Sequence, residues 1–288
     1  MIAALAHLCR ASDQEVGVVA VDPTSPYSGG ALLGDRIRMN DLATDRGIFI
    51  RSMATRGSLG GLATTSKEVI DLMDAFGLAR LLIETVGVGQ AELEITGAAD
   101  TVVVVLVPES GDGIQAMKAG LMEIADIFVV NKADRPGADR VLNDLESALH
   151  LRAGKTAGKF EAHHGIDLTG VAQDAEAASS LPDPDDDAGW EIPVLKTVAQ
   201  TGEGVPELLD AVDRHGTHLD ESGELGLRRR ARAVVRVREV TERALHGILW
   251  RGERTEEVLD AGLDQIYRGV ATPYSISASI LEALLAGN

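Results

Sequence analysis

IFVVNKAD, residues 127–134, is the stretch that decides the fold. Its first four residues, 127–130, are apolar and mostly β-branched, a pattern typical of a short strand that is covered on both faces. NKAD follows at once, at the expected carboxyl end of that strand. Ligands of parallel α/β sheets bind at this end of the strands, so the stretch predicts both a buried strand and a binding loop.

NKAD has the chemistry of a guanine-binding loop. The carboxylate of Asp134 can accept hydrogen bonds from the N1–H and N2–H2 groups of guanine, a donor pair that adenine does not present. Asn131 would brace the loop, and the stem of Lys132 would cover the face of the base. The alternative is an ordinary strand-to-helix turn that Asp134 caps.

The rest of the chain alternates between strand and helix patterns. We expect strands at 16–21, 47–52, 81–83, 101–107, 127–130 and 193–197, and helices at 2–12, 35–43, 114–124 and 205–214, with another ending near residue 77. This alternation predicts an α/β fold with a parallel sheet and crossover helices. From residue 222 the pattern is helical to the end, which predicts a C-terminal helical extension.

Acidic residues and glycines follow two of these strands. In ETVGVGQ, residues 84–90, Glu84 could hold Mg²⁺ through water, and Gly87 could bring its backbone N–H to a γ-phosphate. Asp22 and Asp35 could add oxygen ligands, because Mg²⁺ is usually held by few carboxylates together with waters and phosphates. A strand-ending glutamate with a glycine-rich turn, a turn-forming Asp22 and a helix-capping Asp35 are the plain alternatives.

Two further loops are candidates for function. TVAQTGEGV, residues 197–205, places Val198, Ala199 and Gln200 where backbone N–H groups could contact guanine O6. SGDGIQAMKAG, residues 110–120, carries Gln115 and Lys118 after a strand, although a plain loop with a solvated lysine is equally compatible with it.

Composition restricts the class of protein. The net charge of −18 argues against nucleic-acid partners, which select basic surfaces. Cys9 is the one cysteine, which leaves no intrachain disulfide. No apolar run is long enough to span a membrane, and no signal peptide is recognised, so a cytoplasmic protein is expected. Residues 154–189 are rich in Ala, Asp, Ser and Gly and predict a flexible acidic insertion.

A phosphate-binding loop of the form G-x-x-x-x-G-K-[ST] is missing from the expected place. The only Gly-Lys-Thr is Gly154–Thr156, and Leu149 stands where the leading glycine should be. No strand is expected immediately before it, so we reject it as a phosphate loop.

NKAD, ETVGVGQ and DPTSPYSGGALLGDRIRM (residues 22–39) together make the sequence similar to the MeaB/ArgK-type GTPases, over residues 2–152 and again from 190 to the C-terminal helices. The resemblance implies a P-loop GTPase core at 1–218, a helical dimerisation arm at 219–288, and GTP or GDP with Mg²⁺. It assigns Asp22, Asp35 and Glu84 to the metal and switch region.

The resemblance also implies a partner, methylmalonyl-CoA mutase or a related cobalamin-dependent acyl-CoA mutase, which the protein would serve as a chaperone for cofactor loading. Gln115 and Lys118 fall in the corresponding third switch. In relatives, the segment IAALAHLCR would follow directly after the phosphate loop, so the loop and the first, central strand are expected to be missing.

Two explanations of that difference stay open: a start site set too far downstream, or a degenerate protein that keeps the scaffold without hydrolysis. As the chain stands, we expect little or no GTP hydrolysis, since the amides and lysine of this loop bind the phosphates. The main functional alternative is a non-catalytic protein that docks the mutase. A transport-system kinase or ATPase fits less well, because NKAD selects guanine.

Overall fold

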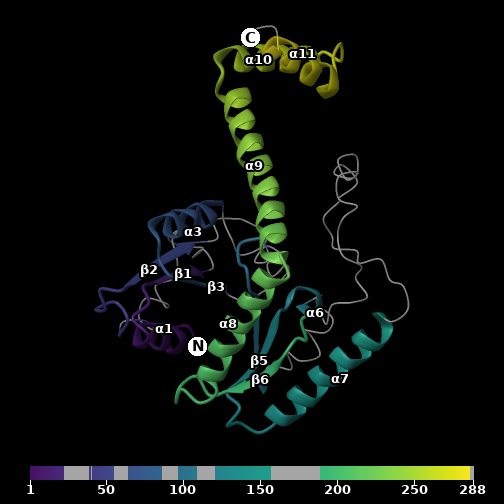
Figure 1. Cartoon of the computed structure of the whole chain (residues 1–288). Coiled ribbons are helices and arrows are strands. Elements are labelled where there is room, and N and C mark those ends of the chain that lie inside the picture. Colours follow the sequence, from purple (N-terminus) through teal and green to yellow (C-terminus); the bar gives the residue numbers. More distant parts are fainter. Residues whose placement is uncertain are drawn as a thin grey trace. The chain divides into compact units, whose positions relative to one another are not determined.

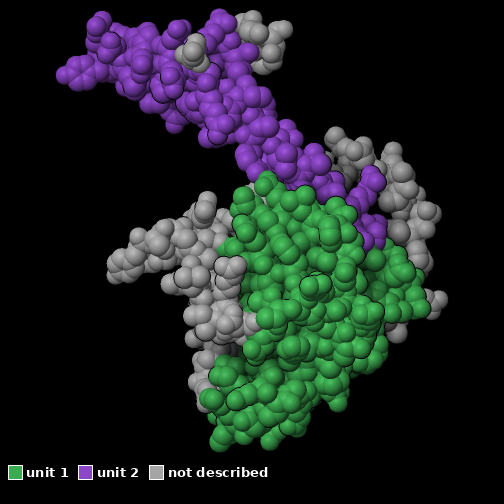
Figure 2. Space-filling model, turned by 90° about the vertical axis from the view of Figure 1, so that its left-hand side faces the viewer, with its two compact units in different colours: residues 1–225 green, residues 226–288 purple. Residues whose placement is uncertain are grey.

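The computed structural model describes residues 1–22, 39, 41–54, 64–85, 97–108, 121–156 and 189–285. The chain divides into two compact units, Met1–Leu225 and Gly226–Asn288 (Figure 2). The predicted boundary after residue 218 falls inside helix α8 (Val205–Glu221), which is buried at Leu219 near its end. A helix that packs on the first core along its whole length belongs to that unit, and the division therefore lies further along the chain.

The first unit has the expected alternation of strands and helices (Figure 1). Its strands are β1 (Val16–Asp22), β2 (Ile48–Ala54), β3 (Arg80–Glu84), β4 (Val103–Leu106), β5 (Ile127–Asn131) and β6 (Val194–Thr197). Its helices are α1 (Ile2–Ala11), α3 (Thr64–Phe76), α6 (Leu121–Ile124), α7 (Ala138–Thr156) and α8.

The described strands form two three-stranded sheets, in the orders β2-β1-β3 and β4-β5-β6. All four strand pairs are parallel, as the alternation predicted. Within the described residues, β3 and β4 each pair on one side only.

Hydrophobic packing joins the two sheets. Leu82 of β3 and Val103 of β4 both pack against one cluster, which includes Leu5 of α1 and Ile127 of β5. The other face of α1 buries Cys9 against the first sheet. The helix predicted over residues 2–12 is thus amphipathic and packs on both sheets.

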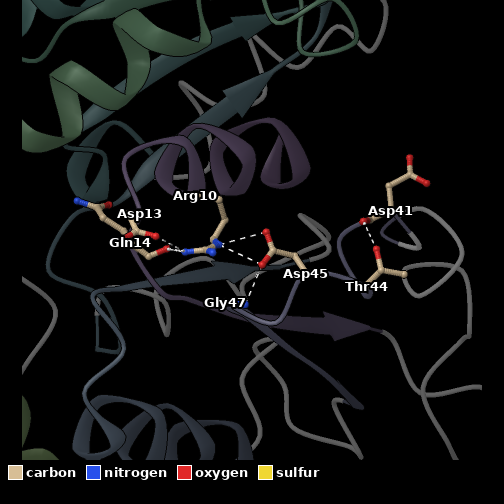
Figure 3. A network of polar contacts seen from close by, with 7 residues as sticks. All are labelled: Arg10, Asp13, Gln14, Asp41, Thr44, Asp45 and Gly47. Atoms are coloured by element: carbon tan, nitrogen blue, oxygen red, sulfur yellow. Dashed lines mark hydrogen bonds and ion pairs between the residues drawn. The ribbon is translucent and has the colours of Figure 1, made fainter.

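A polar network fixes the carboxyl end of α1 (Figure 3). Arg10 donates from Nε to both carboxylate oxygens of Asp45, at 3.2 and 3.1 Å, and from Nη1 to the carbonyl oxygen of Gln14 at 2.9 Å. Asp45 also accepts a 2.8 Å bond from the backbone N–H of Gly47. The Gly47 N–H and the Arg10 guanidinium lower the pKa of the Asp45 carboxyl, because both stabilise its charged form.

Three expectations need correction. Residues 41–44, the described end of the helix expected at 35–43, form a turn. Helix α7 is an element for which no prediction was made. Residues 154–156 are the last residues of α7 and not part of an insertion, and residues 157–188 lie outside the described part. Because a helix precedes Gly154–Thr156, that segment lacks the strand that a phosphate loop requires.

The second unit is helical. It takes most of α9 (Glu224–Arg251), followed by α10 (Glu253–Tyr267) and α11 (Pro273–Leu285). The helices α10 and α11 form a hairpin in which Gly262 lies directly against the side chain of Ile276. Helix α9 has no buried residue.

Candidate functional site

The predicted motifs stand at strand ends, as expected. Asp22 is the last residue of β1 and Glu84 the last residue of β3, and Asn131 and Thr197 end β5 and β6. The register pairs Asn131 directly with Thr197. Parallel strands bring their carboxyl ends to the same edge, so each sheet presents two of these residues at the edge where ligands of such folds bind.

Asn131 braces the loop that follows β6. Its Oδ1 accepts a hydrogen bond from the hydroxyl of Thr197 at 3.2 Å and one from the backbone N–H of Ala199 at 3.1 Å. In the other direction, the backbone N–H of Ala133 donates to the carbonyl of Thr197 at 3.0 Å. These bonds hold NKAD and the 198–200 segment together, so the two segments predicted to contact one base are neighbours.

The backbone of NKAD is shaped for a tight turn. Lys132 has a φ of 58°, a left-handed conformation that is uncommon outside glycine. Its carbonyl accepts from the N–H of Arg135 at 3.0 Å, which closes the turn, and Asp134 is exposed. The carboxylate proposed to read guanine is therefore open to solvent and free to meet a ligand.

The loop after β6 is closed by its own backbone. The N–H of Val198 donates to the carbonyl of Glu203 at 2.9 Å, and the N–H groups of Thr201 and Gly202 both donate to the carbonyl of Val198 at 3.0 Å. Gly204 then has a φ of 73°, and a Cβ there would lie 2.0 Å from the carbonyl oxygen of Lys196. Only glycine fits at this position without a shift of β6 or of the loop.

Only part of the proposed magnesium site lies within the described residues. Glu84 pairs with Ala20 in the register, so Asp22 lies two residues further along the neighbouring strand, roughly 7 Å beyond it. The carboxylate of Glu84 also acts on the α-amino group of Met1: burial lowers the pKa of that amine, and Glu84 opposes the shift. The first turn of α1 thus begins beside Glu84.

Several predicted residues lie outside the described part, namely Asp35, Gly87, Gln115 and Lys118. Among the described residues, no three His, Cys, Asp or Glu side chains converge as a metal site. One carboxylate at each of two strand ends suits Mg²⁺, whose other ligands are usually phosphate oxygens and water. The magnesium site stays a prediction.

Sequence reasoning missed two sets of polar residues. Thr197, which is 1% exposed, supplies a hydroxyl to Asn131, and its position as the last residue of a predicted strand was the available signal. A buried group around His215 and Asp126 was also missed. Its members come from separate segments of the chain, so their spacing in the sequence could not predict that they meet.

The family model for "Methylmalonyl Co-A mutase-associated GTPase MeaB" matches residues 1–253 of the chain. The chain belongs to the MeaB family. This match covers the NKAD loop, both strand-end carboxylates and the loop after β6, and it extends through α9 into the second unit.

Named relatives agree with this assignment, and a solved structure agrees with the fold. A protein of Pyrococcus abyssi, provisionally named as a GTPase, is 43% identical over 276 residues, covering 94% of this chain and 75% of its own. GTPase ArgK of Escherichia coli is 34% identical over 242 residues, covering 83% of this chain and 64% of its own. The crystal structure of a LAO/AO transport system kinase matches 97% of this chain and 74% of its own, with a TM-score of 0.59 and 24% identity.

These comparisons establish the fold and the family. The fold is that of a parallel-sheet α/β P-loop GTPase, as the sequence predicted, and the family is one of guanine-nucleotide-binding proteins. None of the described helices is both long enough and apolar enough to cross a bilayer.

Proposed function

We propose that the chain binds guanine nucleotides through Asn131, Lys132 and Asp134, with the 198–200 loop beside the base and the backbone N–H of Gln200 facing guanine O6. The N–H groups of Val198 and Ala199, which the sequence also offered for this contact, are instead bonded to the Glu203 carbonyl and to Asn131 Oδ1. The hydrogen bonds from Thr197 and Ala199 to Asn131 Oδ1 carry this proposal. They hold the two loops side by side, and the exposed carboxylate of Asp134 supplies the two acceptors that guanine requires.

In this scheme the residues of the chain bind and orient the nucleotide. Asp134 selects the base, the Lys132 stem covers it, and Asn131 keeps both loops in place. Asp22, Asp35 and Glu84 would hold Mg²⁺, which would neutralise charge on the phosphates. Hydrolysis would depend on positioning and on electrostatic stabilisation rather than on a strong general base, as is usual for phosphoryl transfer.

Nucleotide competition tests the base-reading step. A fluorescent GDP analogue would be titrated with the chain in Mg²⁺, and GDP, ATP and xanthosine diphosphate would compete for it. We expect Asp134→Asn to weaken guanine binding at least about tenfold and to favour xanthine, since one acceptor becomes a donor. Asp144→Asn, the same charge change on the surface of α7, is the matched control and should leave binding unchanged.

We further propose that the protein is a chaperone for a cobalamin-dependent methylmalonyl-CoA mutase. Support comes from the family match and from a 34% identical mouse relative named "Methylmalonic aciduria type A homolog, mitochondrial", of which the chain covers 46%. Co-elution with a methylmalonyl-CoA mutase on size exclusion, compared with and without GTP, tests the association. Failure to co-elute in either state would contradict the proposal.

The alternative is a non-catalytic docking protein. In this alternative the scaffold docks the mutase without hydrolysis, and the Gly-Lys-Thr at the end of helix α7, which follows no strand, is not a phosphate loop. Phosphate release from GTP distinguishes the two functions. Magnesium-dependent release by this chain, abolished by Asp134→Asn when assayed at a GTP concentration below its Kd, would refute the non-catalytic alternative.

A homodimer through the C-terminal helices is also proposed. On α9, exposed apolar side chains repeat at helical spacing along one stripe, formed by Leu227, Val234, Val237, Leu245 and Ile248. Light scattering after size exclusion should give twice the chain mass for the parent protein and a single mass for Val237→Lys. Val240→Lys, an exposed valine away from that stripe, is the matched control.

A further inference from the structure

A buried polar cluster lies at the amino ends of β4 and β5. The His215 ring of α8 is fully buried, and its Nδ1 shares a 2.8 Å hydrogen bond with the Thr101 hydroxyl. Nε2 lies 3.3 Å from Asp126 Oδ1, but outside hydrogen-bond geometry. Asp126 accepts a 2.7 Å bond at Oδ2 from the N–H of Val102, and its carbonyl accepts a 2.8 Å bond from the indole N–H of Trp190. We name these four side chains, of Thr101, Asp126, Trp190 and His215, the His215 cluster.

The His215 cluster ties α8 to three strands. Thr101 precedes β4, Asp126 precedes β5, and Trp190 precedes β6, while its indole ring lies 4.8 Å from the His215 ring between centroids. The remaining fully buried side chains of α8, Val205, Leu208, Ala211 and Leu219, are apolar. Within the described part, His215 is therefore the one buried polar side chain that α8 presents to the sheet.

The cluster resembles a catalytic triad in composition only. A hydroxyl, an imidazole and a carboxylate are connected in the order found in serine hydrolases. The imidazole, however, is 0% exposed, and no substrate can reach it without separating α8 from the sheet. The cluster therefore has a structural role and not a catalytic one.

Polar and apolar contacts constrain a helix differently. Apolar packing is non-directional and tolerates small shifts of one element over another. The buried His215 imidazole, in contrast, would lose its hydrogen bond with the Thr101 hydroxyl and its place beside Asp126 on such a shift, and an unpaired buried polar group costs more than the pair gains. The His215 cluster therefore favours one position of α8 along the sheet.

The position of α8 determines the shape of the loop after β6. The helix begins at Val205, whose N–H donates to the carbonyl of Gly202 at 3.3 Å, and the N–H of Leu208 donates to the carbonyl of Gly204 at 3.1 Å. The loop that includes Val198–Gln200 is thus continuous with the first turn of α8. Because Gly204 lies tightly against the Lys196 carbonyl, a shift of the helix cannot leave the loop in place.

We propose that His215, bonded to Thr101 and packed beside Asp126 and Trp190, is a positioning residue for the guanine-binding loop. It acts from ten residues along α8, roughly 15 Å from the helix start, by fixing where that helix lies on the sheet. This inference rests on the proposed function for the identity of the ligand, but the restraint on the loop is a property of the protein without nucleotide.

Amide hydrogen exchange of the nucleotide-free chain, measured residue by residue by NMR, tests the restraint. The probes are the N–H groups of Val198, Gly202 and Val205, which are bonded within the loop, and the reference is the N–H of Phe128 in β5. His215→Leu keeps the size of the side chain but removes its hydrogen-bonding groups. We expect this variant to speed exchange of the loop amides at least about tenfold relative to Phe128.

Leu219→Ala is the control, since it weakens the same helix without touching the cluster. Its loss of stability should raise loop and Phe128 exchange together and leave their ratio within about twofold of the parent. A His215→Leu ratio within twofold of the parent would overturn the proposal. If His215→Leu does not fold, Asp126→Asn, which removes the charge and keeps the volume, must show the same tenfold rise or the proposal fails.

Failure of this inference and failure of the proposed function are separable. Exchange is measured without nucleotide, so a chain that binds no guanine nucleotide still gives the result. A chain that binds GDP while its loop exchange is insensitive to His215 would retain the proposed function and lose the positioning role.

Discussion

Replacing Gly204 with alanine should be the most damaging change in the loop after β6. The residue has a φ of 73°, and a left-handed conformation costs an alanine about 1–2 kcal/mol. The added Cβ would also lie 2.0 Å from the Lys196 carbonyl oxygen and 3.1 Å from the Thr197 Cα. Relieving that clash requires movement of β6 or of the loop, for which overpacking costs of about 1–3 kcal/mol are typical.

Gly202 supplies a matched control two residues away. Its φ is 86°, but a Cβ there would meet no atom within 4 Å, so Gly202→Ala carries the conformational cost alone. We expect Gly204→Ala to lower the free energy of unfolding by about 2–5 kcal/mol and Gly202→Ala by about 1–2 kcal/mol. The difference between the two variants isolates the contact with Lys196.

Urea unfolding followed by Trp190 fluorescence measures both values. Trp250→Phe removes the second tryptophan, so the signal comes from the ring that packs on His215. If Gly204→Ala and Gly202→Ala differ by less than about 0.5 kcal/mol, the close approach of Gly204 to the β6 backbone does not constrain the loop, and the reasoning is refuted.

Three other changes have definite expectations. Asp45→Asn should lower the stability of the chain above pH 3.8, the ordinary pKa of this carboxyl, and this loss should disappear as pH falls through the lowered folded-state pKa. Thermal unfolding of the parent and the variant from pH 2.5 to 7 measures the difference, and a difference that does not change with pH would contradict the prediction. Gly262→Ala would place a Cβ 2.6 Å from Ile276 Cγ2 and should reduce the helicity of residues 226–288 by circular dichroism; unchanged helicity and melting would contradict close packing. Thr197→Val removes a part-buried hydrogen bond and should lower the free energy of unfolding by about 1 kcal/mol in urea. The Thr201→Val control removes a solvent-exposed hydrogen bond, to the Val198 carbonyl, and should lower it much less; equal losses would contradict the prediction.

The strands could be predicted because their cores are nearly all apolar. The β5 run Ile127–Val130 is buried throughout, and the prediction missed only the final residue, Asn131. A hydrophobic criterion stops at the last apolar residue, while the hydrogen-bond ladder of a strand continues into the polar one. The same reason explains why β1 includes Asp22.

Helix α7 could have been predicted as well. Val141, Leu142, Leu145 and Leu149 stand at three- and four-residue spacing, the pattern of a helix with one buried face, and all four contribute to the cluster around Phe128. The segment lies between the conspicuous NKAD loop and the acidic stretch after it, and its moderate pattern was not assigned.

The His215 cluster could not have been predicted from the sequence. Thr101, Asp126, Trp190 and His215 come from four segments, and each has an ordinary local explanation as a loop, cap or helix-face residue. Their pairing depends on how the strands and α8 pack, which local periodicity does not encode. Asn131 is different: its role followed from a short motif because its partners lie on the neighbouring strand.

The predicted nucleotide site is divided between the two described sheets, and side-chain packing holds those sheets in place. Asp22 and Glu84 end strands of one sheet, whereas Asn131 ends a strand of the other. No backbone ladder joins the sheets in the described part. They are joined by α1, which packs on both, and by the 2.6 Å ion pair from Arg80 of β3 to Asp213 of α8. Because apolar packing is less directional than a β-ladder, the distance between the magnesium side and the guanine side depends on α1 and α8 more than on any residue that would touch the nucleotide.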